Sequence, residues 1–282
     1  MTDYVVYDVF TDTAFGGNQL AVFPDARSLP EAKLQQIAAE FNFSEVTFVY
    51  PPVDPKHTAR VRIFTPTTEV DFAGHPIIGT VIALSDMGHR SPMVLELGVG
   101  PIKCTKDRGG AGFTTFVPLE TFASPKPALI AKALGLHRSA INTDTHAPIQ
   151  ASLGLPFTLV ELDSRASLAA CQINTDAFIE GAKTYPVGLD FAIFAYVRDA
   201  ANIDARMFAP LDNIPEDPAT GSASATLAAL LTEVLGMPQS LSFLQGEDMG
   251  RPSRIKAVTT QDPISVTISG NAVQTMAGPF MI

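Results

Sequence analysis

The pattern of apolar and polar positions predicts a chain of short strands interrupted by a few helices. Its apolar runs are short and rich in β-branched and aromatic residues, a composition typical of strands. Clusters of Gly, Pro and Asn separate the runs and supply the turns. We predict strands at residues 4–10, 20–23, 43–50, 58–66, 94–103, 112–118, 157–162, 191–197, 242–244, 254–259, 264–269 and 273–282.

Helical spacing of apolar residues occurs in fewer places. The segment Ser28-Leu29-Pro30-Glu31 has the sequence of a capping box with proline in the first turn, and helical periodicity follows it. The segment before Gly236 is rich in alanine and leucine, which predicts a buried helix. We predict helices at residues 31–42, 77–87, 128–136, 167–171 and 222–235.

Two pairs of similar segments within the sequence indicate an internal duplication. Arg62-Ile63-Phe64-Thr65-Pro66 matches Arg206-Met207-Phe208-Ala209-Pro210 at an offset of 206 − 62 = 144. A second pair, Asp25-Ala26-Arg27-Ser28-Leu29 against Asp163-Ser164-Arg165-Ala166-Ser167-Leu168, has an offset of 163 − 25 = 138. After the first pair of segments, each copy continues into an acidic loop, a tight glycine turn and an apolar helix. We therefore predict two similar halves.

The duplication also predicts where the domains and the active site lie. The proline-containing segment 119–127 is the candidate linker, because prolines favour extended connections. Residues 1–118 and 273–282 then form the N-terminal half, and residues 128–272 form the C-terminal half. Each half offers a helix N-terminus, whose N–H groups favour a carboxylate or a developing oxyanion. If the two face each other, the active site lies in the cleft between the halves.

Composition and charge exclude several classes of protein. The net charge of −10 argues against a nucleic-acid partner, because phosphate binding needs clustered Lys and Arg. With only 17% charged residues and 46% hydrophobic residues, the chain is suited to bury a substantial core. It contains no apolar run long enough to span a membrane, and its first residues do not resemble a signal peptide. We expect a cytoplasmic protein without a membrane or nucleic-acid partner.

The sequence offers no support for a metal or cofactor. Cys104 and Cys171 are far apart and lack a C-x-x-C pattern, and the five histidines have no metal-ligand spacing. The glycine-rich nucleotide motifs and the G-x-S-x-G serine motif are absent. We therefore expect chemistry that uses no cofactor and no metal.

Acid and imidazole groups near the glycine turns are the candidates for proton chemistry. Glu216 and Asp217 precede the turn Thr220-Gly221-Ser222, where an anion site has no use for them unless one transfers protons. His75 opens the first apolar helix, where the helix dipole favours a neutral imidazole. It can equally be a simple cap. Glu45, near the start of a predicted strand, either faces the cleft or is an ordinary solvated acid.

Five segments carry motifs that together resemble one known family. They are residues 10–23 with Gly17-Asn18, residues 42–49, residues 62–79 with Phe72-Ala73-Gly74-His75-Pro76, residues 216–223, and residues 245–253. In this order, and over nearly the whole chain, they resemble the phenazine-biosynthesis PhzF family. The resemblance implies the diaminopimelate-epimerase-like fold, an α/β (α+β) architecture of two pseudo-symmetric halves. Each half is a mixed β-sheet wrapped around a central helix.

The resemblance also implies an activity and a set of site residues. The type member of the family is an isomerase that moves a hydrogen between ring carbons of a dihydro-hydroxyanthranilate without a cofactor. By resemblance, Glu45 is the general acid/base, while His75 and Asp217, close to Glu45, support proton transfer. Epimerases of this fold use a cysteine at each central helix, and neither cysteine here lies near those turns. Gln19 stands where many relatives have proline. The residues implied in substrate binding are Asn18, Gly74, Thr220, Gly221 and Ser222.

Two other classes of function stay open at this point. An enzyme of the same fold can epimerise or racemise another small amino or hydroxy acid with Glu45 as its base. A non-catalytic binding protein can also retain the fold, although the presence of Glu45, His75 and Asp217 favours catalysis. As in the family, we expect a homodimer and a small-molecule carboxylate as the binding partner.

Overall fold

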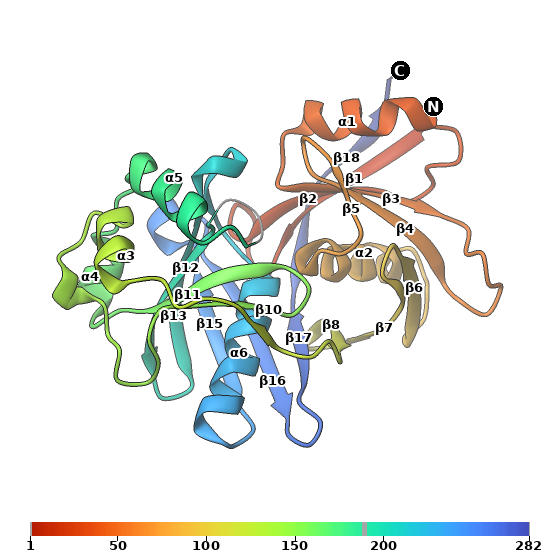
Figure 1. Ribbon diagram of the computed structural model, residues 1–282. Helices are drawn as coiled ribbons and strands as arrows, with labels where there is room; N and C mark the ends of the chain where they lie inside the picture. Colours follow the sequence, from red (N-terminus) through yellow and green to blue (C-terminus); the bar gives the residue numbers. More distant parts are fainter. Residues whose placement is uncertain (1, 188–190, 282) are drawn as a thin grey trace. The chain divides into compact units, whose positions relative to one another are not determined.

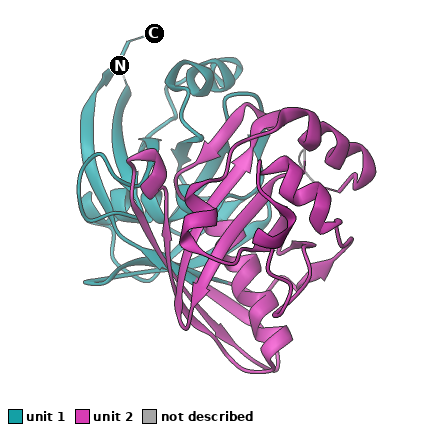
Figure 2. Cartoon of the chain, turned by 90° about the vertical axis from the view of Figure 1, so that its left-hand side faces the viewer, with its two compact units in different colours: residues 1–114, 268–282 teal, residues 115–267 magenta. Residues whose placement is uncertain are grey.

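The computed structural model describes residues 2–187 and 191–281, which form two compact units. Unit 1 comprises residues 1–114 and 268–282, and unit 2 comprises residues 115–267; Figure 2 shows them in different colours. The predicted halves were 1–118 with 273–282, and 128–272. In both divisions, the last strand of the chain belongs to the part that contains the first strand.

Unit 1 is a mixed sheet with two α-helices (Figure 1). Its final strand β18 pairs antiparallel with β1, so the two ends of the chain lie in neighbouring strands. Figure 1 shows β18 running beside β1. The elements are β1 (Thr2–Val9), β2 (Asn18–Phe23), the 3-10 turn η1 (Glu31–Lys33), α1 (Leu34–Phe41), β3 (Glu45–Tyr50), β4 (Ala59–Phe64), β5 (Glu69–Val70), α2 (Gly74–Asp86), β6 (Met93–Leu97), β7 (Gly100–Asp107), β8 (Gly110–Thr115) and β18 (Ala272–Phe280).

Unit 2 has the same kind of sheet with more helices around it. The elements are β9 (Glu120–Thr121), α3 (Pro127–Ala133), η2 (Arg138–Ala140), β10 (Ile149–Ser152), β11 (Pro156–Glu161), α4 (Arg165–Ala169), α5 (Thr175–Thr184), β12 (Ile193–Asp199), β13 (Asn202–Ala209), η3 (Pro210–Asp212), β14 (Ile214–Asp217), α6 (Gly221–Leu235), β15 (Ser240–Gln245), η4 (Glu247–Met249), β16 (Ser253–Thr260) and the first part of β17 (Ser265–Gly270), whose last three residues belong to unit 1.

Strand pairing confirms the predicted duplication. In unit 1, β1/β2 is antiparallel, β2/β3 parallel, β3/β4 antiparallel, β4/β5 antiparallel, β4/β6 parallel and β6/β7 antiparallel. Unit 2 repeats this order with β10/β11, β11/β12, β12/β13, β13/β14, β13/β15 and β15/β16. Both units are therefore built on one mixed-sheet plan, as the predicted fold class requires.

A buried helix forms the centre of each unit. In α2, every residue from Gly74 to Leu84 is buried, and the helix packs on β1, β2, β3 and β7 of its own sheet. In α6, the buried residues extend from Gly221 to Thr232, and the helix packs on β10, β11 and β16. Gly236 ends α6 in the left-handed conformation, which a residue without Cβ adopts at little cost. The prediction of apolar helices after the glycine turns is confirmed.

Aromatic packing fixes the last strand in the core of unit 1. Phe280 of β18 contacts the rings of Tyr4, Phe23 and Phe41, with ring centroids 6.3, 5.3 and 6.0 Å away. Phe23 in turn stacks on Phe48 at 5.1 Å. Aromatic pairs of this kind contribute about 0.5–1.5 kcal/mol each beyond the area they bury. These contacts explain why a strand so distant in sequence returns to unit 1.

Local predictions were wrong in two places. The Ser28 hydroxyl contacts the Thr2 hydroxyl instead of capping the helix, and the first turn is a 3-10 turn after Pro30 without a side-chain cap. The predicted strand 94–103 is a hairpin, because β6 and β7 are separate strands that pair with each other across Gly98 and Val99. Apolar residues alternate with polar ones on both sides of the turn, so the sequence pattern predicted one continuous strand.

The predicted linker, residues 119–127, contains the short strand β9, which pairs with β10 of unit 2. Beyond it, Phe122 N donates to Gln150 O at 2.9 Å, and Gln150 N donates to Ala123 O at 2.7 Å. The helix α5 and the strand β10 were not predicted. Within residues 2–187 and 191–281, no helix is long and apolar enough to cross a membrane.

Candidate active site

Glu45 lies at the start of β3, beside the first turn of the central helix of unit 1. The parallel pairing of β2 and β3 places Glu45 opposite Leu20. Its Oε2 atom lies 3.2 Å from His75 Nδ1, and the Glu45 side chain is 17% exposed. The structure therefore brings two of the predicted catalytic residues, Glu45 and His75, into contact. The reading of Glu45 as an ordinary solvated acid does not describe this position.

His75 is neutral at physiological pH, and the main cause is burial. Its side chain is 5% exposed, and burial lowers the pKa of His75 to about 3. A charged imidazole would lose its hydration in this buried position, so the charged form is strongly disfavoured. The sequence predicted a neutral imidazole from the helix dipole, whereas desolvation is the cause that the structure identifies.

The backbone around His75 selects its tautomer. Nε2 lies 3.4 Å from the carbonyl oxygen of Gln19, which can only accept a hydrogen bond. A neutral ring that donates from Nε2 has a lone pair on Nδ1, the atom that faces Glu45. In this tautomer Nδ1 is an acceptor for a proton carried by Glu45. Because the Gln19 contact uses a main-chain carbonyl, it does not depend on the residue type at position 19.

Asn18 is buried at the start of β2, and its Oδ1 accepts a hydrogen bond of 3.3 Å from the Ser44 hydroxyl. Ser44 directly precedes Glu45, so this bond ties the two strand starts together. Gly74 begins α2, and Ala73 at the N-cap offers no side-chain hydrogen bond to the first turn. We refer to Asn18, Ser44, Glu45, Gly74 and His75 as the Glu45 cluster.

In unit 2, the two acids before the second turn have different tasks. Glu216 forms a bidentate ion pair with Arg206, with both N–O distances 2.8 Å. The guanidinium also donates to the carbonyls of Leu168, Ala169 and Cys171 at 3.0, 3.3 and 3.3 Å. The hydrogen bonds to Glu216 raise the pKa of Arg206. Glu216 is thus a structural partner, which leaves Asp217 as the candidate for proton chemistry.

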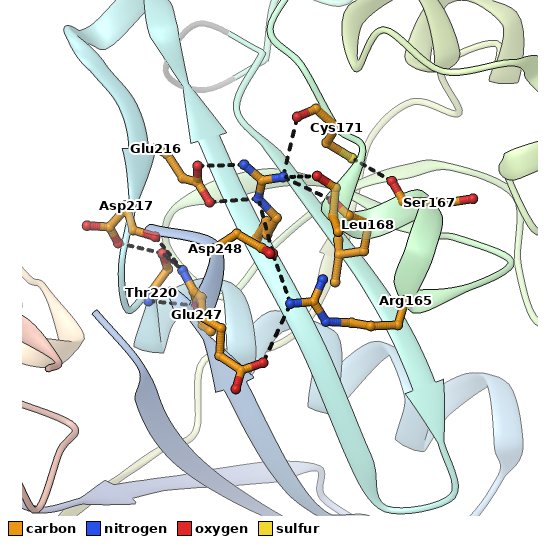
Figure 3. Close-up of polar contacts among 12 residues, drawn as sticks. Arg165, Ser167, Leu168, Cys171, Glu216, Asp217, Thr220, Glu247 and Asp248 are labelled. Carbon is orange, nitrogen blue, oxygen red and sulfur yellow. Dashed lines mark hydrogen bonds and ion pairs between the residues drawn. The ribbon is translucent and has the colours of Figure 1, made fainter. Parts of the chain in front are cut away.

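Asp217 is held by the turn that begins α6. The Thr220 hydroxyl donates to Asp217 Oδ2 at 2.5 Å, and both residues are buried. Figure 3 shows the contact between Thr220 and Asp217, with Glu216 nearby. The Thr220 amide donates to the Gln245 side chain at 3.1 Å. Both polar hydrogens of Thr220 are therefore used inside unit 2, and its predicted role in substrate binding stays a prediction.

The remaining predicted residues lie at the start of α6. Gly221 is the first residue of the helix and is buried, while Ser222 is partly exposed. We refer to Asp217, Thr220, Gly221, Ser222 and Gln245 as the Asp217 cluster. The predicted closeness of Glu45 to Asp217 joins residues of different units and stays a prediction.

Cys104 and Cys171 belong to neither the Glu45 cluster nor the Asp217 cluster, and both are poor nucleophiles. Cys104 is in the middle of β7, and Cys171 follows α4; both are buried. Burial raises the pKa of each thiol to about 12, so the reactive thiolate form is rare near pH 7. In the described part of the chain, no group of His, Cys, Asp or Glu side chains is arranged to hold a metal ion.

Two members of these clusters, Ser44 and Gln245, are absent from the residues predicted for the site. Ser44 lies in the family-like segment 42–49, but the resemblance implied no role for it. Gln245 stands directly before Gly246 at the end of a strand, a pattern shared by many turns. Its partners, Asp217 and Thr220, lie more than twenty residues earlier, and only the fold brings them together.

Comparison with known proteins identifies the family. The family model for phenazine biosynthesis-like proteins of the PhzC-PhzF family matches residues 7–278. An uncharacterized isomerase of Mesorhizobium japonicum is 36% identical over 99% of each chain. A trans-2,3-dihydro-3-hydroxyanthranilate isomerase of Pseudomonas aeruginosa is 34% identical over 96% of each chain. The crystal structure of a Bacillus anthracis PhzF-family protein superposes with a TM-score of 0.88 and 23% identity, covering 100% of this chain and 99% of the other.

The solved structure shows that the fold of this chain is the one found in a PhzF-family protein. The likeness extends over almost the entire chain. The protein therefore belongs to the phenazine-biosynthesis PhzC-PhzF family and is an isomerase with the diaminopimelate-epimerase-like fold.

Proposed function

We propose that this protein is a cofactor-independent isomerase that moves a proton between two carbons of a small cyclic carboxylate, with Glu45 as the general acid/base. The observation that carries the proposal is the contact of 3.2 Å between Glu45 and a buried, neutral His75. The name of the Pseudomonas aeruginosa relative supports a substrate of the dihydro-hydroxyanthranilate type.

The chemistry needs one group that removes a proton from carbon and returns it to a different carbon. A carboxylate does this when it changes between its two protonation states at working pH. In the proposed step, Glu45 takes the proton as the C–H bond breaks, and the electron pair delocalises into the unsaturated ring. A second C–H bond then forms with the proton of the Glu45 carboxyl group, which exchanges with water before it is transferred, so the product takes up solvent hydrogen and the isomerisation involves no net oxidation or reduction.

His75 and Asp217 have supporting roles in this proposal. The neutral His75 ring offers its Nδ1 lone pair to the proton on Glu45, which helps to orient the carboxyl group. Main-chain N–H groups at the start of a helix favour the negative charge that develops on a substrate. Gly74 and Gly221 begin the two central helices and are the proposed source of these donors, and Asp217 assists the proton transfer.

The test measures deuterium uptake from solvent into the substrate. Wild type and Glu45→Gln are incubated in D2O with dihydro-hydroxyanthranilate, and ring deuteration is followed by NMR. A positioned acid/base contributes about 10²–10⁴-fold, so Glu45→Gln should slow the exchange by that factor while ligand binding persists. Glu40→Gln, an exposed acid on α1, is the matched control and should exchange like wild type. Equal exchange by wild type and Glu45→Gln would reject the mechanism.

A further inference from the structure

The side chain of Gln245 forms an amide bridge beneath the turn that carries Asp217. Its Nε2 donates to Asp217 O at 2.8 Å and to Thr220 Oγ1 at 3.0 Å. Its Oε1 accepts from Thr220 N at 3.1 Å. Gln245 is 1% exposed, so these bonds are not shared with bulk water.

The orientation of this amide follows from its main-chain partners. A backbone carbonyl can only accept and a backbone N–H can only donate, so Asp217 O faces the NH2 group and Thr220 N faces the carbonyl oxygen. The Thr220 hydroxyl then accepts from Nε2 and has its own hydrogen left for Asp217 Oδ2, 2.5 Å away. The donor and the acceptor of each hydrogen bond in the series from Gln245 through Thr220 to Asp217 are therefore fixed.

Unit 1 shows that the fold itself does not require this amide. In the duplicated hairpins, Ile63 pairs with Val70 as Met207 pairs with Asp217, so Val70 stands in the place of Asp217. The pairing of β4 with β6 and of β13 with β15 likewise places Glu96 in the position of Leu244. The next residues, Leu97 and Gln245, correspond, and each is followed by a glycine.

The two polar residues therefore occur together in unit 2 and are both absent from the matching positions of unit 1. Where the hairpin carries Val70, the strand end carries the apolar Leu97, which is also buried. Where the hairpin carries Asp217, the strand end carries Gln245. If Gln245 only stabilised the turn, its replacement by Leu97 in unit 1 would not be expected to accompany the replacement of Asp217 by Val70.

The glycine after Gln245 allows the close approach that this bridge needs. Gly246 has a φ of +77°, in the left-handed region, and a Cβ there would lie only 2.8 Å from the carbonyl oxygen of Pro218. The end of β15 thus packs directly against the loop between Asp217 and Thr220. Packing at this distance limits how far the carboxylate can move.

We infer that Gln245 is a positioning residue of the isomerase, which fixes the Thr220 hydroxyl as a hydrogen-bond donor to Asp217 and so holds that carboxylate in one orientation for proton transfer. The inference rests on the proposed role of Asp217. It assigns a task to the 245–253 segment, which was recognised in the sequence only as a family motif.

The first test uses hydrogen exchange and needs no substrate. In Gln245→Leu, which copies the residue found at Leu97, the Thr220 amide loses its acceptor and should exchange at least tenfold faster, since hydrogen-bonded amides exchange only after opening. The Ser224 amide, which donates to Thr220 O within the first turn of α6, should keep its protection. Unchanged exchange at Thr220 would reject the bridge, whatever the substrate of the enzyme is.

The second test separates positioning from a merely structural role. Loss of an outer partner of a reacting group typically costs roughly 10–100-fold in activity, so kcat of Gln245→Leu should fall by that factor with a smaller change in KM. Gln150→Leu removes another buried amide of unit 2, whose Nε2 donates to Tyr185 O at 3.3 Å, and it should affect kcat much less. Equal kcat values in wild type and Gln245→Leu would overturn the inference.

Gln245→Glu supplies a pH signature that does not depend on how well Gln245→Leu folds. A protonated carboxyl at this position can donate to Asp217 O and accept from Thr220 N, whereas a carboxylate has no hydrogen to donate and adds charge beside Asp217. The kcat of Gln245→Glu should therefore fall as pH rises, on a limb that wild type lacks. A profile parallel to that of wild type would contradict the inference. If wild type itself does not deuterate the substrate, the proposed function fails, and the Thr220 exchange measurement still decides the bridge.

Discussion

The hairpins that precede the two central helices share one framework and differ in the residues that can do chemistry. In unit 1, Arg62 of β4 forms a bidentate pair with Glu69 of β5, with both distances 2.6 Å. In unit 2, Arg206 of β13 forms the same pair with Glu216 of β14. Each guanidinium also lies over the phenylalanine two residues later, at 5.2 Å in unit 1 and 4.9 Å in unit 2. The repeated sequence motif thus produces the same arginine–glutamate ion pair and the same arginine–phenylalanine contact in both units.

The reactive groups do not follow this repeat. Asp217 has Val70 as its counterpart, so the acid of the second hairpin is absent from the first. Conversely, Val46 pairs with Phe64 as Ile193 pairs with Phe208, so the counterpart of Glu45 is the preceding residue, the buried Ala192. Each unit therefore carries one candidate acid, at a position that is apolar in the other unit. The two units therefore share the duplicated sheet and helix but differ in the positions of their candidate acids.

The largest predicted effect tests whether the two acids are equivalent. Glu45→Gln should lower kcat by about 10²–10⁴-fold, because it removes the proton carrier. Asp217→Asn should lower kcat less, because the amide keeps the hydrogen bond to Thr220 as an acceptor and loses only the charge. The rate constants are measured by NMR for single variants and for the double variant.

Groups that serve one step are not additive, so the double variant should be little slower than Glu45→Gln alone. A double variant whose loss equals the product of the two single losses would show that the acids act independently. An Asp217→Asn variant slower than Glu45→Gln would reverse the assigned roles.

The next largest effect concerns the repeated arginine–glutamate pair. The Arg206 and Glu216 side chains are 10% and 15% exposed, whereas those of Arg62 and Glu69 are 24% and 41% exposed. Removing one partner of a buried pair costs about 3–5 kcal/mol, while an exposed pair contributes about 0–1 kcal/mol. Arg206→Met should therefore lower the free energy of unfolding far more than Arg62→Met. Urea denaturation of both variants measures the difference, and equal losses would show that burial does not distinguish the pairs.

The third effect is a difference in acid sensitivity that originates in His75. Its pKa is lowered to about 3 in the folded protein, against an ordinary value near 6.5 in the unfolded chain. Between these values the unfolded chain binds the extra proton and the folded chain does not, so folding stability is lost as pH falls from about 6.5 towards 3. His75→Gln removes this titration and should lose less stability over the same window.

Other groups with shifted pKa values, including His146 in unit 2, are common to both proteins and cancel in the difference. Thermal melting at several pH values therefore isolates His75. Parallel curves for wild type and His75→Gln between pH 6.5 and 4 would show that His75 does not resist protonation.

The fold was largely predictable from sequence, because its signals are local and repeated. The Arg-x-Phe-x-Pro phrase, the glycine turns and the apolar helices mark each copy of the unit, and strand pairing agrees with them. The contact between Glu45 and His75 was suggested only by family resemblance, since the two residues lie on different elements. The Gln245 bridge was not predicted at all. It depends on strand register, which places residues distant in sequence beside one another and leaves no periodic trace.

The smallest predicted effect examines the last link of that bridge, the Thr220 hydroxyl. Thr220→Val keeps the shape and the backbone bond to Gln245 but removes the hydroxyl that donates to Asp217 Oδ2 and accepts from Gln245 Nε2. A typical hydrogen bond contributes about 0.5–1.5 kcal/mol net, so kcat should fall by roughly two- to tenfold. Thr220→Ser restores a hydroxyl at the same atom and should recover most of the rate. If Thr220→Ser is as slow as Thr220→Val, the lost methyl contacts matter more than the hydroxyl. The backbone alone would then hold Asp217, as it holds Val70 in the hairpin of unit 1.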